Sequence, residues 1–169
     1  GTAAAVPLGL EFDLKSHWKI YWRSPGDAGY PPRIDWAGSD NLRAATIGWP
    51  APMRFAVLGL QTVGYEGHVV LPIAASLARA GQPLDLKAAL SYLTCNDVCI
   101  PYDTRLALNV PPGDGAPSSD AGLIARFAAH EPSRQQTAAL SLRDVTVIPG
   151  AHPQLELRVD ASPPLANPD

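Results

Sequence analysis

Short stretches in which apolar and polar residues alternate recur along most of this chain. The alternation is regular over residues 8–15 and 84–92, and the apolar runs 18–22, 33–36, 42–49, 68–74 and 104–110 have the length of strands. A period of two is typical of a strand with one buried face. Fourteen glycines and 18 prolines separate these runs. The pattern predicts an all-β fold, an antiparallel sandwich of short strands.

Three segments interrupt the regular pattern. Residues 50–60 are apolar but begin with Pro50 and Pro52, so the sequence predicts a loop and no regular central strand. Such a loop either packs on the edge of the core or forms a lid over a reactive group, with Phe55 as the shielding side chain. Residues 64–67 are predicted to turn, and Pro72 predicts an edge position or a bulge for the strand that carries it.

The last third of the chain has a different pattern. After a break rich in proline and glycine at 111–117, Ser118, Ser119 and Asp120 offer N-caps to a short helix that ends before Pro132. Residues 139–148 and 154–160 then predict two more strands, too few to close a sandwich of their own. We therefore expect a β domain at 1–112, a linker with a short helix at 113–135, and the start of a second β domain at 136–169.

Charge and hydropathy exclude several classes of protein. The net charge of −3 gives no basis for nucleic-acid binding. No apolar run reaches the roughly 18 residues of a membrane span, and no basic and apolar signal segment opens the chain. The chain from Gly1 on therefore has the features of a mature or trimmed soluble fragment.

The chemistry that the sequence offers lies in its only two cysteines, Cys95 and Cys99. As a structural staple, a disulfide across about five residues would contribute only roughly 2 kcal/mol, against about 4 for a loop ten times longer. A disulfide also needs Cα atoms within about 6 Å, so the chain must turn at Asn96 and Asp97, which favour turns. A close pair without metal partners fits an oxidising compartment. A redox-active dithiol and a structural staple both remain open.

Metal binding is the weaker alternative. A zinc site needs four ligands, usually in pairs, and the four histidines, His17, His68, His130 and His152, are isolated from one another. A Cu(I) ion could use the two thiolates with Met53. We expect neither metal nor cofactor. A non-catalytic β-sandwich binding module with an inert disulfide and a Cu(I)-binding domain are the alternatives to a redox function.

Four motifs occur in order along the first two thirds of the chain. They are His17-Trp-Lys-Ile-Tyr-Trp-Arg-Ser-Pro-Gly-Asp-Ala-Gly29, Trp49-Pro-Ala-Pro52, Gly64-Tyr-Glu-Gly67 and Thr94-Cys-Asn-Asp-Val-Cys-Ile-Pro101. Together they resemble the N-terminal periplasmic domain of the DsbD-type membrane thiol:disulfide reductases, and within these the ScsB branch, which is linked to copper tolerance. The resemblance covers about residues 8–110.

The resemblance implies an immunoglobulin-like β-sandwich in the periplasm, part of an inner-membrane protein. Such a domain receives electrons from the transmembrane redox domain of its own chain. It passes them to periplasmic thioredoxin-like proteins, of the ScsC or DsbC type. By this resemblance Cys99 engages the partner protein and Cys95 is the resolving thiol.

The same resemblance implies a cap over the cysteine pair, formed by residues 51–60, with Phe55 and Met53 as its shielding side chains. The chain departs from the DsbD form because its cysteines lie closer together and residues 52–55 lack acidic side chains. Asp97 should oppose formation of a thiolate by like-charge repulsion, and no lysine or arginine is adjacent in sequence. The remaining neighbours expected at the site are Asn96, Tyr92 and Pro101.

Overall fold

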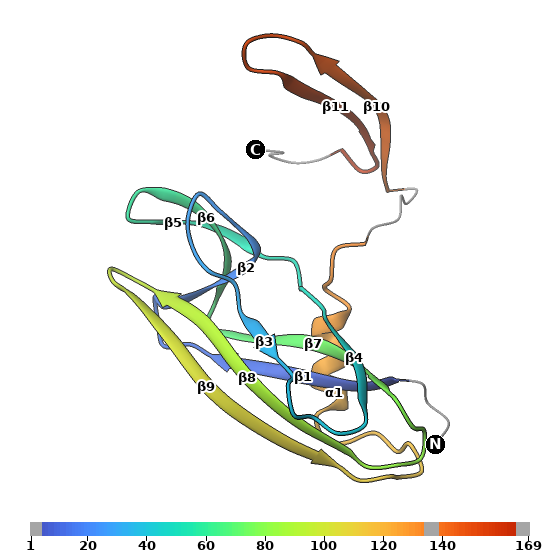
Figure 1. The fold of residues 1–169 in the computed structure, drawn as a ribbon. Helices are drawn as coiled ribbons and strands as arrows, with labels where there is room; N and C mark the ends of the chain where they lie inside the picture. Colours follow the sequence, from blue (N-terminus) through green and yellow to red (C-terminus); the bar gives the residue numbers. More distant parts are fainter. Residues whose placement is uncertain (1–4, 134–138, 165–169) are drawn as a thin grey trace. The chain divides into compact units, whose positions relative to one another are not determined.

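In a computed structural model of the protein, residues 5–133 and 139–164 are described. The chain divides into two compact units, Gly1–Pro132 and Ser133–Asp169. The first unit holds nine strands and one helix (Figure 1). Their bounds are β1 (Ala5–Asp13), β2 (Lys19–Gly26), β3 (Arg33–Asp35), β4 (Leu42–Ile47), β5 (Met53–Val57), β6 (Leu60–Glu66), β7 (His68–Leu77), β8 (Leu84–Cys95), β9 (Cys99–Val110) and α1 (Ala121–Ala128).

The strands of this unit form two antiparallel sheets. One has the order β1-β7-β4, and the other has the order β3-β8-β2-β6-β5, with β9 paired to β8. Alternate residues of both sheets meet in the core, because successive side chains of a strand point to opposite faces. The main cluster takes Phe12 and Leu71 from the smaller sheet and Ile20 and Leu90 from the larger one. The antiparallel β-sandwich predicted from the alternation is confirmed.

Strands β7 and β6 differ from their sequence-based predictions. Pro72 lies in β7, the central strand of its sheet, and the register of β7 with β1 is continuous through it, so the expected edge position or bulge is wrong. Its carbonyl oxygen accepts a hydrogen bond from the Gly48 N–H (2.6 Å). In a strand the N–H and C=O of one residue point the same way, and the pairing of β4 ends at Ile47. The missing N–H of Pro72 therefore faces Gly48, just beyond the last paired residue of β4, so no bond within the β4–β7 pairing is lost.

Residues 64–66 are also not a turn. They belong to β6, and the turn is confined to Gly67, which has a φ of 71°. Gly64 is buried where β6 pairs with β2, opposite Tyr21, and a Cβ there would collide with the carbonyl oxygen of Ile20. Gly64 is thus a point of close backbone approach within the sheet, which the sequence alone does not distinguish from a turn glycine.

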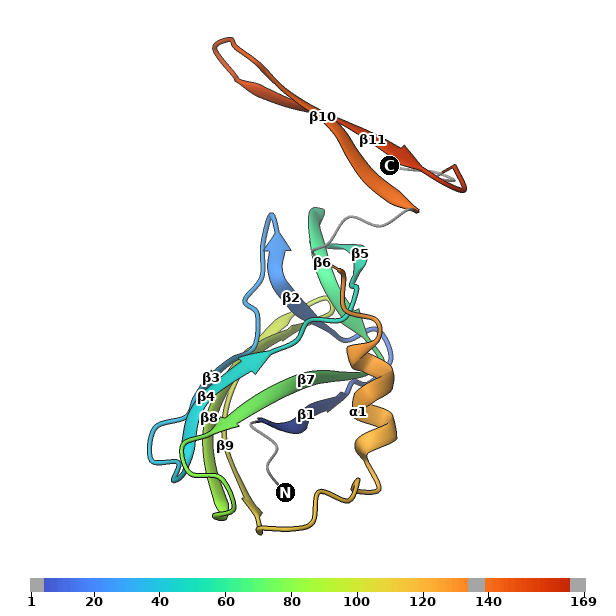
Figure 2. The ribbon, with the colours of Figure 1, turned by 90° about the vertical axis from the view of Figure 1, so that its right-hand side faces the viewer.

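Helix α1 covers the outer face of the smaller sheet (Figure 2). Its half-buried residues include Leu123, Ile124 and Phe127, the stripe predicted from the sequence. A Cβ added at Gly9 in β1 would lie 3.1 Å from the Ile124 side chain, and the Phe127 ring lies edge-on to His68 at 5.6 Å. The helix expected within a linker at 113–135 therefore packs on the sandwich.

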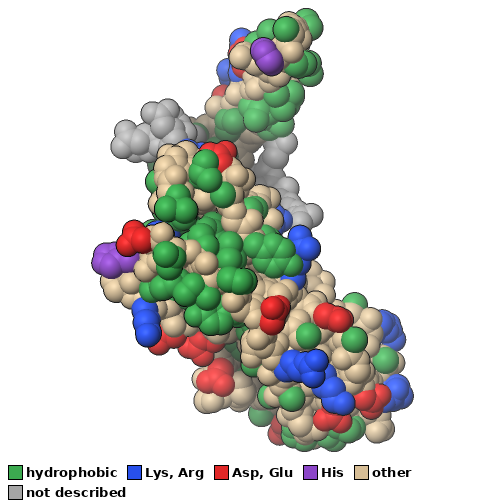
Figure 3. All heavy atoms as spheres, turned by 60° about the vertical axis from the view of Figure 1, so that its left-hand side comes forward, with side chains coloured by type: hydrophobic (Ala, Val, Ile, Leu, Met, Phe, Trp, Pro, Cys, Tyr) green, Lys and Arg blue, Asp and Glu red, His purple; other side chains and the backbone are tan. Residues whose placement is uncertain are grey.

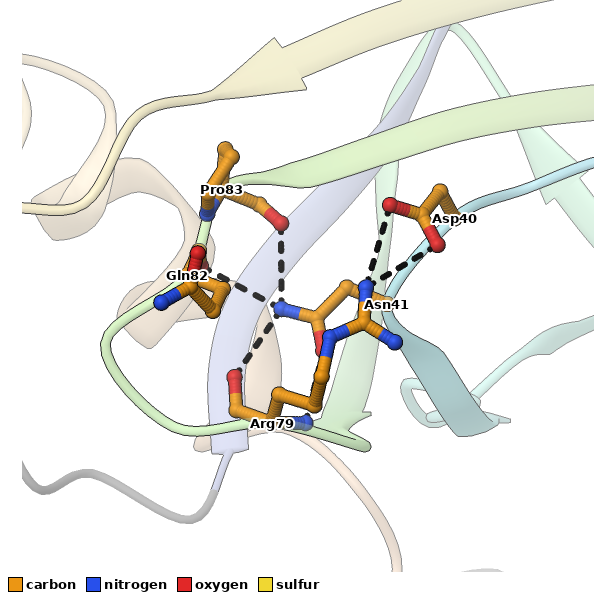
Figure 4. A network of polar contacts seen from close by, with 5 residues as sticks. All are labelled: Asp40, Asn41, Arg79, Gln82 and Pro83. Atoms are coloured by element: carbon orange, nitrogen blue, oxygen red, sulfur yellow. Dashed lines mark hydrogen bonds and ion pairs between the residues drawn. The ribbon is translucent and has the colours of Figure 1, made fainter.

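Asn41 fixes the connection from β7 to β8 (Figure 4). Its side chain is buried, and its Nδ2 donates to the carbonyl oxygens of Arg79, Gln82 and Pro83 at 3.0–3.2 Å. The Arg79 N–H donates back to Asn41 Oδ1 at 2.6 Å. Asn41 has a φ of 63°, a left-handed conformation that asparagine tolerates better than most residues. The Asn41 side chain thus makes four hydrogen bonds to the backbone of this loop.

The second unit is described as a two-stranded antiparallel hairpin, β10 (Leu140–Ile148) and β11 (Gln154–Ala161). These bounds match the strands predicted at 139–148 and 154–160. The register pairs Leu142 with Val159, Val145 with Leu157 and Val147 with Leu155. All six side chains are exposed, so the hairpin presents one apolar face.

Candidate functional site: the Cys95–Cys99 disulfide

Cys95 and Cys99 form a disulfide across the turn between β8 and β9, with their Cα atoms 4.1 Å apart. Cys95 is the last residue of β8 and Cys99 is the first of β9, and the two are paired in the ladder. The predicted turn is confirmed. The Asn96 N–H donates to the Val98 carbonyl, and the Val98 N–H donates to Asn96 Oδ1, both at 3.0 Å. The asparagine side chain therefore closes the turn that brings the cysteines together.

The two cysteines differ in exposure. Cys95 is completely buried, in a small cluster with Tyr21 and Val57, whereas Cys99 and the turn residues Asp97 and Val98 are exposed. This cluster lies on the other face of the larger sheet from the sandwich core, because Lys19 pairs with Cys95 while its neighbour Ile20 faces the core. The disulfide thus has a protected end and an accessible end.

The cap expected at 51–60 is a hairpin, β5–β6, and not a loop. Met53–Val57 pairs with β6 as the edge strand of the sheet, after Pro50 and Pro52. Phe55 packs against the cluster that contains Cys95, and its ring lies 6.3 Å from that of Tyr21. Met53 is half exposed. The structure therefore places Phe55 beside the buried end of the disulfide and Met53 at the surface.

Tyr21 completes the apolar side of the site. Burial raises the pKa of its phenol above the ordinary value, so the side chain is neutral at physiological pH. Its ring lies against the backbone of Gly29, where a Cβ would collide with it and where φ is 117°. The loop that carries Gly29 is thereby held against the ring. Tyr21 lies in the apolar run at 18–22, where the sequence predicts a strand but does not indicate a neighbour of the disulfide.

Lys19 is a second neighbour that sequence reasoning missed. It is paired with Cys95 across β2 and β8, and its side chain is only 16% exposed. The Nζ lies 5.5 Å from the centre of the Phe55 ring and 3.7 Å from a Glu66 carboxylate oxygen. Seventy-six residues of sequence separate Lys19 from Cys95, so only the cross-strand register could reveal this cation.

The other predicted neighbours lie around the site in different ways. Tyr92 faces the sandwich core, edge-on to Phe12 and stacked on Tyr102, with ring centres 5.2 Å apart in both pairs. Burial, and then Tyr102, raise its pKa. Pro101 pairs with Leu93 in the ladder. Tyr92 is thus in the adjoining core, and the turn residues form the rim of the disulfide.

Exposed apolar side chains occur on both hairpins that contribute to the site. Val98 lies in the β8–β9 turn next to Cys99, and Leu58, Leu60 and Met53 belong to the β5–β6 hairpin, whose Phe55 and Val57 pack in the Cys95 cluster; these four side chains are 45–73% exposed. Figure 3 shows hydrophobic side chains gathered on the face to which these turns project. Exposed apolar patches of this kind mark surfaces that contact other proteins.

Two further observations concern metal binding and membrane-spanning helices. Among the described residues, no three histidine, cysteine or acidic side chains come together as they would around a metal ion. Within the same ranges, no helix has the length and apolar character needed to cross a bilayer.

Two solved structures and one protein family are similar to this chain. One match is a crystal structure of the N-terminal periplasmic domain of ScsB from Proteus mirabilis. It is 25% identical, covers 98% of this chain and 78% of that one, and has a TM-score of 0.63. The reduced N-terminal domain of DsbD from Neisseria meningitidis is 20% identical and covers 65% of this chain and 91% of that one, with a TM-score of 0.37.

A search among curated proteins gave no match. The fold is the immunoglobulin-like sandwich implied by the resemblance. Residues 2–111 match the family "Thiol:disulfide interchange protein DsbD, N-terminal", and this match spans both cysteines. The chain therefore belongs to the DsbD N-terminal family of thiol-disulfide exchange domains.

Proposed function

We propose that this domain is a periplasmic electron relay in which Cys99 exchanges with partner proteins and Cys95 resolves the mixed disulfide. The observation that carries this assignment is the difference in burial: Cys95 is fully buried and Cys99 is exposed. A partner's sulfur can approach only the accessible end of the pair. The polarity expected by family resemblance thus has independent support from solvent access.

The reducing direction has two steps. The Cys99 thiolate attacks the disulfide of an oxidised partner, forms a Cys99–partner disulfide and releases one partner thiolate. The Cys95 thiolate then attacks the Cys99 sulfur, forms the Cys95–Cys99 disulfide and releases the second partner thiolate. Two electrons pass to the partner, and the domain ends oxidised without any cofactor. The same steps in reverse recharge it.

The partners follow from family membership. We propose periplasmic thioredoxin-like proteins, of the ScsC or DsbC type, as electron acceptors, and the transmembrane redox domain of the full-length chain as donor. The apolar rim around Cys99 supports docking of such proteins. Phe55, packed on the Cys95 cluster, is proposed as the shield that keeps other thiols away from the pair.

Trapping tests the assignment. Reduced Cys95→Ser and Cys99→Ser variants are mixed separately with a thioredoxin-like partner that keeps only its attacking cysteine, activated with thionitrobenzoate. We expect Cys95→Ser, which retains Cys99, to form the mixed disulfide much faster than Cys99→Ser. In denaturant the two rates should become similar, because the difference arises from burial.

Two results would contradict the proposal in different ways. A faster reaction through Cys95 would keep the relay and reverse the roles of the cysteines. No mixed disulfide from either variant, with several thioredoxin-like partners, would favour the binding module with an inert disulfide.

A further inference from the structure

Strand β9 is an unprotected sheet edge. It pairs with β8 along one side, and no other described strand pairs with it. All of its 12 residues except Val110 are exposed. Its apolar side chains include Ile100, Tyr102, Leu106 and Leu108, which are 37–51% exposed. A long exposed edge of this kind is a template for pairing with another strand.

The ladder shows which backbone groups of β9 are available. The Asn96 N–H donates to the Val98 carbonyl. In an antiparallel ladder, hydrogen-bonded pairs alternate with pairs that share no backbone hydrogen bond. The pairs of even-numbered residues, such as Leu90 with Thr104, are therefore the hydrogen-bonded ones. The N–H and C=O groups of the odd-numbered residues 99–109 then point away from β8. Pro101 occupies one of these positions, where its missing N–H removes no bond to β8.

The two faces of β9 differ in character. Even-numbered residues share a face with Leu84, Leu86, Ala88 and Leu90 of β8, which are buried in the core. On that face β9 extends the core outward as an uncovered apolar shelf. On the opposite face lie Asp103 and Arg105, which form no ion pair within the described ranges.

We propose that β9 pairs antiparallel with β9 of a second copy of this chain, around a twofold axis at Thr104. Each Asp103 then lies opposite Arg105 of the second copy, and each pair exchanges backbone hydrogen bonds. On the shelf, Tyr102 meets the second copy's Leu106, Ile100 meets its Leu108, and the two Thr104 side chains face each other. All of these cross-strand pairs are favourable.

The charges of Asp103 and Arg105 favour this register of the two β9 strands over the adjacent registers. A shift of two residues, the smallest that keeps the apolar shelf continuous, would put either two Asp103 or two Arg105 side chains opposite each other. Like charges directly opposite are destabilising. The edge is therefore complementary to itself in one register, which is what a twofold interface requires. This inference does not depend on the proposed redox function.

The charges give a sharp test by sedimentation equilibrium of the 169-residue chain, from about 10 μM to about 1 mM, the range of a weak dimer. We expect the parent chain to dimerise. Asp103→Arg and Arg105→Asp should each weaken the dimer by about tenfold or more, because opposite charges become like charges. A mixture of the two variants should form heterodimers, and the double variant D103R/R105D should regain the parent's dimer.

Ala107→Pro provides a second variant that leaves charge unchanged. It removes an outward N–H while sparing the ladder with β8, so the fold, checked by circular dichroism, should persist while the dimer weakens. A parent chain that stays monomeric throughout this concentration range would overturn the proposal. A dimer whose stability is the same in the parent and in these variants would also overturn it. Failure of the mixture to restore pairing would overturn the register.

Discussion

At the scale of single residues, the site is defined by contrasts in solvent access and charge around one disulfide. Cys95 is fully buried and Cys99 is exposed, although both belong to the same turn. Lys19 and Phe55 come from other strands and lie on the buried side. Solvent access and local charge at the two sulfur atoms therefore depend on side chains that are distant in sequence. Substitution of those side chains can change either property while both cysteines are kept.

Removal of the Phe55 ring should open the buried side of the pair. Phe55→Ala leaves space over Tyr21 and Cys95, so we expect the disulfide to be reduced several-fold faster by a small thiol such as dithiothreitol. The change should also cost about 2–4 kcal/mol of stability, because a half-buried ring is lost. Met53→Ala, which alters an exposed residue of the same strand, is the control. Equal reduction rates in parent and Phe55→Ala would show that the ring is no shield.

Lys19 should favour the thiolate form of Cys95 once the disulfide is reduced, because a nearby cation stabilises a thiolate. Lys19→Met keeps most of the apolar stem and removes the charge. In a Cys99→Ser background, where Cys95 is the only thiol, we expect slower alkylation by iodoacetamide near neutral pH. The difference should disappear at high pH, where the thiolate forms in both proteins. A rate difference that persists there would indicate changed access instead of charge.

At the scale of elements, polar side chains decide how strands connect. The Asn96 side chain closes the β8–β9 turn, and Asn41 satisfies three carbonyl groups of the β7–β8 loop. The sequence marks both as turn-favouring residues. Which carbonyl groups they bind depends on how the strands fold back.

Asn41→Ala should destabilise the protein by about 2–3 kcal/mol, because the part-buried hydrogen bonds to three carbonyl groups are lost and alanine is strained at positive φ. Asn41→Gly is the matched control, since it loses the same hydrogen bonds without the backbone strain and should cost less. Urea unfolding measures both, with an unchanged dependence on denaturant. A loss below about 0.5 kcal/mol in Asn41→Ala would mean that water replaces the side chain in this loop.

At the scale of the whole molecule, the sandwich core and the cluster that contains Cys95 are separate. The core lies between the two sheets, while Cys95 packs with Tyr21 and Val57 on the outer side of one of them. A disulfide that closes so short a loop contributes only about 2 kcal/mol. We therefore expect the fold to persist when the disulfide is reduced.

Stability should fall at alkaline pH through the buried tyrosines. Burial is the main cause that raises the pKa of Tyr65, whose hydroxyl donates to the Pro50 carbonyl at 2.8 Å. The neutral phenol is favoured in the folded state, so its contribution is complete below about pH 10, the pKa of an unfolded tyrosine, and is lost progressively above it.

Tyr65→Phe tests this dependence. We expect a cost of about 1 kcal/mol at pH 8 from the lost hydrogen bond, and a smaller decline of stability between pH 8 and pH 11 than in the parent. Urea unfolding at both values measures the two effects, and Tyr30→Phe controls for loss of a surface hydroxyl. An identical decline of stability in the parent and in Tyr65→Phe would mean that other groups cause the loss of stability at alkaline pH.

The sequence by itself determined most of the secondary structure and the location of the two cysteines. Alternation with a period of two depends on local exposure, so it indicated most of the strands, and the stripe on α1 followed from helical spacing in the same way. The cysteine spacing and the turn at Asn96 are equally local. Both features confine the disulfide to one short segment, independently of how the rest of the chain folds.

Only the tertiary structure decided what surrounds that segment. Pro72 is tolerated in a central strand because the pairing of β4 ends beside it, and a glycine is needed at position 64 because the backbone of β2 lies close to β6 there. Lys19 and Tyr21 reach Cys95 through cross-strand register, which depends on pairing between distant residues. The burial that separates Cys95 from Cys99 arises in the same way, because solvent access is a property of the packed sheets and not of the local sequence.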